Sequence, residues 1–173
     1  MKASSRIAVG LGVSFALVAV PFLFGARVNT TPSIPVGLYW ASDAPVTVGS
    51  YVLFCPPQRE DFLEARRRDY IGAGACPGGF GHLMKRVLAA KGDQVSMRAE
   101  GVLVNGQELP FSASKTVDGG GRPLPRPPAS ELLLGDGEFL LMATNNPKSF
   151  DGRYFGPINR SQIKAVISPV ITW

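Results

Sequence analysis

The 173-residue chain contains one histidine, His82, and only two cysteines, Cys55 and Cys76. A Ser-His-Asp catalytic site would therefore have to use His82 as its base. One histidine and two cysteines cannot complete the usual four-ligand zinc site, and neither cysteine lies next to a second ligand motif. We therefore expect neither a metal ion nor another cofactor.

Charge is also scarce, at 18% of the residues against 45% apolar residues, and this balance excludes a disordered chain. The formal net charge is +5, but beyond residue 27 only 15 basic residues face 13 acidic ones, which leaves +2. Nucleic-acid-binding proteins normally carry a basic stripe. The one dense group, residues 66–68, is better explained as the end of a short helix over residues 57–69, whose dipole it complements. We expect no nucleic-acid partner.

Residues 7–26 form an apolar run without a charged side chain. A helix of about 20 such residues can cross a bilayer, and the preceding Lys2 and Arg6 favour a cytoplasmic N-terminus. A cleavable signal peptide is the alternative, but Leu23 and Phe24 occupy positions where a cleavage site needs small residues. We predict an N-terminal membrane anchor or signal segment over residues 1–27 and an exported domain over residues 28–173.

An exported domain folds in an oxidising compartment, where a lone pair of cysteines usually forms a disulfide. We therefore predict a bond between Cys55 and Cys76. The chain-entropy model assigns a loop of this size about 3 kcal/mol of stabilisation.

Alternating and clustered apolar residues predict strands over residues 51–54, 82–88, 102–104, 138–142 and 163–171. Asn105-Gly106 is typical of a type I′ hairpin turn, and helical periodicity is scarce. The body should thus be mostly β. Residues 56–81 and 112–130 break the pattern and are interpreted as surface insertions. We interpret the second as a mobile loop, with a substrate-contacting flap as the alternative.

Ser33 lies between Pro32 and Pro35, a few residues beyond the apolar run. The prolines at these positions stiffen the backbone that presents the hydroxyl. Ser33 is therefore a candidate nucleophile for chains emerging from a bilayer, although most loop serines are simply solvated.

Lys85 is a candidate general base for such a serine. If residues 82–89 form a strand, one face carries Leu83, Lys85, Val87 and Ala89, so the ammonium is the only charge on an apolar face. Burial there lowers the pKa of a lysine toward the range in which a neutral amine accepts a proton. The alternative is a lysine whose stem packs and whose amine reaches water.

A third polar group follows at Ser149, Asp151 and Arg153, which would share one face if the backbone were locally extended. Such a group can orient a catalytic base. It can equally be a structural ion pair that pins a loop.

Together, the three groups resemble the conserved boxes of signal peptidase I-type serine proteases. Ser-Ile-Pro at 33–35 resembles the serine box, residues 85–93 the lysine box, and residues 149–156 the final box. The form of residues 33–39 and the ending at 156–164 resemble the TraF branch of conjugative transfer proteases. The resemblance implies a mostly β, signal-peptidase-like catalytic domain that follows an N-terminal transmembrane or signal helix and carries surface insertions.

The resemblance also implies roles for individual residues. Ser33 would be the nucleophile, Lys85 the general base, and Asp151 a further residue needed for activity. Thr31 matches a position that supplies a hydroxyl to the oxyanion hole, and Ser149 and Arg153 match supporting positions. Residues 143–147 depart from the Gly-Asp-Asn-Arg-Asp pattern of general signal peptidases.

The implied function is processing of a conjugative pilin precursor for plasmid transfer, with possible cyclisation by transpeptidation. Its implied partners are the pilin precursor, the inner membrane through residues 7–26, and other conjugative transfer proteins. A general type I preprotein signal peptidase is the first alternative. A non-catalytic envelope component of the conjugation apparatus is an alternative of another class.

Overall fold

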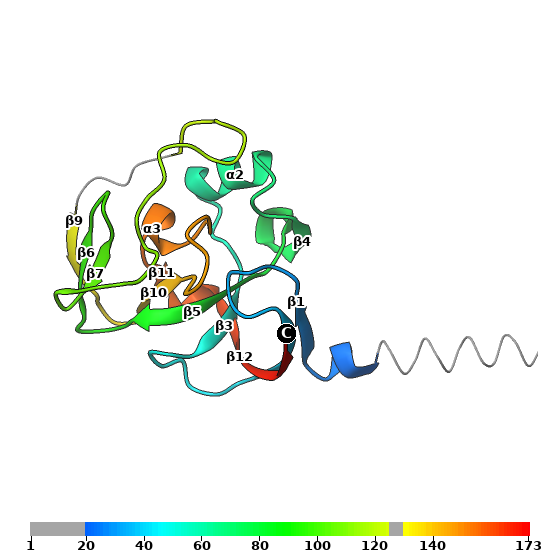
Figure 1. The fold of residues 1–173 in the computed structure, drawn as a ribbon. Coiled ribbons are helices and arrows are strands. Elements are labelled where there is room, and N and C mark those ends of the chain that lie inside the picture. Colours follow the sequence, from blue (N-terminus) through cyan, green and yellow to red (C-terminus); the bar gives the residue numbers. More distant parts are fainter. Residues whose placement is uncertain (1–19, 125–129) are drawn as a thin grey trace, which may run out of the picture.

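The computed structural model describes residues 20–124 and 130–173, and the described chain is mostly β, as predicted (Figure 1). The strands are β1 (Ala26–Asn29), β2 (Gly37–Ser42), β3 (Tyr51–Phe54), β4 (Ala73–Cys76), β5 (Leu83–Ala89), β6 (Gln94–Met97), β7 (Val102–Val104), β8 (Gln107–Glu108), β9 (Ser130–Leu133), β10 (Glu138–Met142), β11 (Ile158–Asn159) and β12 (Ile163–Thr172). The helices are α2 (Glu60–Arg67) and α3 (Gly152–Phe155), with 3-10 turns η1 (Pro77–Gly79) and η2 (Arg160–Gln162).

The strands form two sheets. The larger has the order β1-β2-β12-β3-β5-β10-β11, and the smaller has the order β8-β7-β6-β9. All the strand pairs are antiparallel. The small sheet lies at the β5–β10 side of the molecule, and α2 and α3 lie above the large sheet in the view of Figure 1. The chain's C-terminal end lies close to β1, where the domain begins.

The five predicted strands all form, with boundaries that shift by at most a residue. Asn105 and Gly106 have positive φ values of 51° and 80° and join β7 to β8, as expected for a type I′ hairpin. The predicted helix over residues 57–69 is shorter and forms α2. The acidic residues of its first turn and the arginines of its last turn match the helix dipole.

The long strand β12 holds the large sheet together because it pairs with β2 on one side and β3 on the other. Its Pro169 has no N–H to donate, and the register between β12 and β2 shifts directly after it. β3 is nearly all buried, as a central strand should be. The main apolar core packs β3 and β5 against α2 and α3, and a second core fills the space under the small sheet.

Residues 20–23 form a helical turn ahead of β1. Most of the segment predicted as an anchor, residues 1–19 of 1–27, lies outside the described residues. Within residues 20–124 and 130–173, no helix is both long enough and apolar enough to cross a membrane.

Candidate active site

The loop between β1 and β2 carries Ser33, and the Asn29 side chain holds this loop in shape. Asn29 is buried, and its Nδ2 donates to the carbonyl oxygens of Thr31 (2.7 Å), Ile34 (3.0 Å) and Pro35 (3.0 Å). Asn29 Oδ1 accepts from the backbone N–H of Thr31 at 3.2 Å. The sequence reasoning missed Asn29, because an asparagine next to Thr-Thr-Pro is also common in ordinary loops.

Two further contacts fix the end of the same loop. The buried Tyr39 donates its hydroxyl to the Pro35 carbonyl at 2.7 Å. Gly37 lies so close to β12 that an added Cβ would stand 2.2 Å from the Ile171 carbonyl oxygen. Gly37, the first residue of β2, therefore has to be glycine, and β12 packs against the backbone where the Ser33 loop ends.

Lys85 reaches this loop from β5. The side chains of β5 alternate in burial as predicted, and Lys85 is only 3% exposed. Its Nζ donates to Ser33 Oγ at 2.8 Å, and Ser33 itself is 8% exposed. Burial lowers the pKa of Lys85 from 10.5 to about 8; Asp151 opposes this shift and Arg153 adds to it.

Ser149 contacts the same hydroxyl from a distant part of the chain. Its Oγ lies 3.2 Å from Ser33 Oγ, and it is buried. Among the described residues, the side-chain partners of Ser33 are thus Lys85 and Ser149. The structure brings together one residue from each of the three groups that the sequence singled out.

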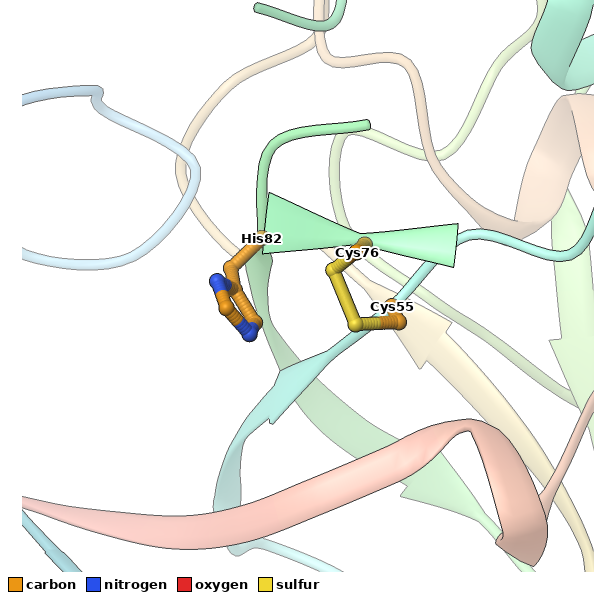
Figure 2. Close-up of side chains that lie close together, drawn as sticks. All are labelled: Cys55, Cys76 and His82. Atoms are coloured by element: carbon orange, nitrogen blue, oxygen red, sulfur yellow. A yellow bond between two sulfur atoms is a disulfide. The ribbon is translucent and has the colours of Figure 1, made fainter. Parts of the chain in front are cut away.

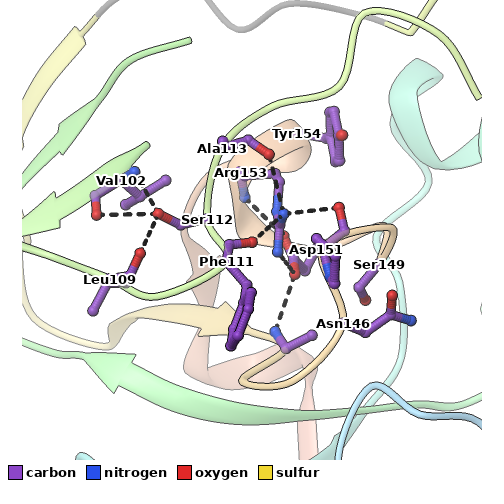
Figure 3. A network of polar contacts seen from close by, with 12 residues as sticks. Val102, Leu109, Phe111, Ser112, Ala113, Asn146, Ser149, Asp151, Arg153 and Tyr154 are labelled. Atoms are coloured by element: carbon purple, nitrogen blue, oxygen red, sulfur yellow. Dashed lines mark hydrogen bonds and ion pairs between the residues drawn. The ribbon is translucent and has the colours of Figure 1, made fainter. Parts of the chain in front are cut away.

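Asp151 and Arg153 form a fully buried ion pair beside these residues (Figure 3). Arg153 Nε donates to Asp151 Oδ1 at 2.8 Å and Nη2 to Oδ2 at 2.9 Å, which is a bidentate pairing. Asp151 also accepts from the Ala143 backbone N–H at 3.0 Å. Asp151 itself has an extended backbone and caps α3, where it accepts from the Arg153 N–H of the first turn, so the condition of a locally extended backbone holds at Asp151 but not at Arg153.

The remaining Arg153 nitrogen ties down two separate segments. Its Nη1 donates to the carbonyl oxygens of Phe111 (2.7 Å), Ala113 (3.3 Å) and Pro147 (3.2 Å) (Figure 3). Phe111 has a φ of 57°, which is a costly conformation for a bulky residue. The Arg153 contact holds the Phe111 carbonyl in this orientation, so the buried arginine connects residues 111–113 to the loop that precedes Ser149.

Residues 111–124, which we call the flap, are held down at several points. Asp118 accepts hydrogen bonds from the Tyr70 hydroxyl and from Arg122, and these contacts hold its pKa well below the usual range. Lys115 donates its backbone N–H to the Tyr154 hydroxyl at 2.9 Å. Arg68 donates to the Pro123 carbonyl at 2.6 Å. The mobility of residues 112–130 stays a prediction.

A cavity of about 630 Å³ opens next to Ser33 and Lys85. Its lining includes the loop of Ser33, the start of β5, residues of the flap, Ser149 with its neighbours, and Tyr154. Residues 115, 117–119 and 124 of the flap line this cavity, and their contact with a substrate, the alternative for this segment, stays a prediction.

His82 directly precedes β5 and lies beside the disulfide (Figure 2). The predicted bond between Cys55 and Cys76 is present, with an S–S distance of 2.05 Å. The two sulfurs and a His82 nitrogen lie within 4.8 Å of one another, but bonded sulfurs offer no thiolate to a metal. Burial is the main cause of a lowered His82 pKa, and Ser33 pairs with Lys85 and Ser149 rather than with this ring.

Thr31 lines the cavity two residues before Ser33. Its hydroxyl donates to Asn29 Oδ1 at 3.1 Å. In this arrangement the hydroxyl hydrogen is directed toward Asn29, so the role of Thr31 in an oxyanion hole stays a prediction.

Comparison with known proteins gives a consistent result. The family model described as "Signal peptidase, peptidase S26" matches residues 3–173. A curated "Plasmid transfer protein TraF" of Escherichia coli is 60% identical over 172 residues, which cover 97% of each chain. A "Probable conjugal transfer protein TraF" of Sinorhizobium fredii is 40% identical over 86% of this chain and 78% of its own. The crystal structure of a signal peptidase I from Enterococcus faecalis matches with 16% identity and a TM-score of 0.42, over 73% of this chain and 100% of that one.

Proposed function

Because the chain belongs to the signal peptidase family, peptidase S26, and to its TraF-like conjugative transfer proteins, we propose that it is a serine endopeptidase with a Ser33–Lys85 dyad. The observation that carries this proposal is the 2.8 Å contact between the buried Lys85 amine and Ser33 Oγ. A buried amine with a pKa of about 8 has a substantial neutral fraction near neutral pH, so it can act as a base.

In the proposed reaction, neutral Lys85 takes the Ser33 proton while Oγ attacks the carbonyl carbon of the scissile peptide bond. The protonated lysine then gives this proton to the leaving amine, and an ester on Ser33 remains. Water or an amine attacks the ester, and Lys85 takes and returns a proton a second time. Water gives cleavage, and the substrate's own N-terminal amine gives a cyclic product.

The oxyanion would be bound by the Ser33 backbone N–H and by the Thr31 hydroxyl after it turns away from Asn29. One such donor typically lowers the barrier by about 3 kcal/mol. Ser149 would orient the Ser33 hydroxyl, since the two Oγ atoms are 3.2 Å apart. Asp151 and Arg153 would position the loop of Ser149 and adjust the pKa of Lys85 through their opposite charges.

The proposed substrate is a conjugative pilin precursor, which the enzyme cuts and can cyclise during plasmid transfer. The names of two relatives, a plasmid transfer protein and a probable conjugal transfer protein, support this context. We place the domain in the periplasm, held to the inner membrane through residues 7–26 and working beside other conjugative transfer proteins. The Cys55–Cys76 disulfide is consistent with an oxidising compartment.

Co-expression of the full chain with the pilin precursor tests the proposal, with intact mass as the measurement. We expect Ser33→Ala and Lys85→Met to abolish processing and His82→Gln to retain it. A cyclic product weighs one water less than the linear cleaved form, so the same spectrum separates transpeptidation from hydrolysis.

Two results would contradict parts of the proposal. If folded Ser33→Ala and Lys85→Met still process the precursor and support transfer, the protein acts as a non-catalytic envelope component. If the wild type instead cleaves ordinary secretory preproteins and leaves the pilin precursor intact, it is a general signal peptidase.

A further inference from the structure

The charges that line the cavity are unbalanced. Three lysines line it, Lys85 at the catalytic position and Lys115 and Lys148 at the flap side, against one carboxylate, Asp118. Asp118 is already neutralised by Arg122, which donates to it at 2.6 Å, and is further engaged by the Tyr70 hydroxyl. The described part of the cavity wall therefore carries a net positive charge.

Lys115 and Lys148 reach the cavity from two different segments. Lys115 belongs to the flap and is anchored through its backbone by Tyr154. Lys148 directly precedes Ser149, whose hydroxyl contacts the Ser33 hydroxyl. Both lysines are exposed, and none of the ion pairs among residues 20–124 and 130–173 involves either amine.

We propose that the flap side of this cavity binds a carboxylate that the substrate carries close to the scissile bond, through Lys115 and Lys148. The carboxylate is either an acidic side chain or the free C-terminus of the precursor. This inference rests on the proposed peptidase function and adds a substrate class to it. Apolar flap residues Val117 and Leu124 line the same wall, so the preferred segment also carries an apolar side chain.

The position of the two lysines favours a substrate over a lipid headgroup as their partner. They lie on the walls of a cavity that also holds the nucleophile. Like charges there disfavour a substrate with lysine or arginine at the same place, which gives selectivity as well as affinity.

The test measures initial rates of pilin precursor processing by the purified full chain in neutral detergent micelles, at low and at high salt. Enzyme variants are Lys115→Gln, Lys148→Gln and the double variant, with Lys91→Gln as the matched control, because Lys91 is exposed and pairs with Asp136 away from the cavity. In one set of substrates, Asp and Glu near the mapped cut become Asn and Gln. In another, two added glycines move the C-terminal carboxylate.

We expect each lysine variant to raise KM about three- to fivefold, the range for a partly exposed charge pair, and the effect to shrink at high salt. Lys91→Gln should leave KM unchanged. With the substrate that lacks the recognised carboxylate, the KM of the wild type should rise by the same factor. The KM of the lysine variants should show no further rise with that substrate. The substrate set that shows this loss identifies the source of the carboxylate.

Equal KM values for acidic and neutral substrates would overturn the inference while leaving the peptidase function intact. A lysine effect that occurs only in vesicles containing phosphatidylglycerol, and not in neutral micelles, would also overturn it, because the lysines would then bind lipid headgroups. Failure of the proposed function itself looks different: the wild type would not process any precursor, or Ser33→Ala would process it as well as the wild type.

Discussion

Replacing Lys85 with methionine should abolish activity and stabilise the protein at neutral pH. Burial lowers the pKa of Lys85 from 10.5 to about 8, which means that the folded state disfavours the charged amine. At pH 7 the unfolded chain carries this charge freely, so the folded state bears a cost of about 3 kcal/mol for holding it. Methionine has a similar shape and removes the cost.

The sign of the pH dependence follows from the same numbers. Between pH 8 and 10.5 the unfolded chain binds a proton at this position that the folded wild type has already released. Wild-type stability therefore rises with pH across this window, and the advantage of Lys85→Met shrinks. Between pH 7 and pH 9.5 the advantage should fall by about 2 kcal/mol.

Urea unfolding followed by circular dichroism at the two pH values measures this difference. The lost hydrogen bond to Ser33 and the added packing of methionine shift both values equally, so they cancel in the comparison. Lys91→Met is the control, because the Lys91 side chain is 68% exposed and its substitution should change stability by under about 1 kcal/mol at both pH values. A stability difference between Lys85→Met and wild type that does not change with pH would refute the argument that burial lowers the pKa of Lys85.

Three further outcomes are expected. The kcat/KM of the wild type for precursor processing should rise about tenfold per pH unit below pH 8 and level off above it, as Lys85 deprotonates; an optimum in acid would contradict a neutral amine base. In Asp151→Asn, the pH midpoint of the residual activity should move to lower pH, because Asp151 raises the pKa of Lys85 and Arg153 lowers it. The same substitution should cost about 3–5 kcal/mol of stability, because it leaves the buried Arg153 unpaired. An unchanged midpoint would show that Asp151 does not influence the pKa of Lys85. Replacing Cys55 and Cys76 by serine should lower the unfolding free energy by about 3 kcal/mol in urea titrations, and an unchanged midpoint would show that the bond does not constrain the unfolded chain.

The central pair of the site can be predicted because its signal is local. Strand alternation places a side chain on one face or the other, so the single lysine among apolar neighbours on β5 stands out in the amino-acid sequence itself. Lys85 is indeed buried on this face, and its role as a base stays a prediction. The hairpin turn at Asn105-Gly106 is predictable for the same reason, since two adjacent residues determine it.

The parts that could not be predicted depend on distant contacts. Asn29 matters because its side-chain amide donates to three backbone carbonyls of the following loop. The residues next to Asn29 in the sequence do not indicate these contacts. The flap lies along the cavity because Tyr154 and Arg153 bind its backbone from α3, 39 and 42 residues further along the chain. Such contacts leave no periodic pattern in the sequence. Arg153 lies in α3, which Asp151 caps, so simple strand alternation does not describe residues 151–153.

The support that β12 gives to Gly37 has a consequence for the order in which this protein becomes competent during its synthesis. Thr172 of β12 pairs with Gly37, where the loop that carries Ser33 ends. This contact can form only after β12 has been synthesised and, in the proposed periplasmic location, has crossed the bilayer. Contacts between such distant parts of a chain form late and slowly. In the proposed orientation, a nascent chain would therefore carry Ser33 across the membrane before the strand that packs against Gly37 has been made.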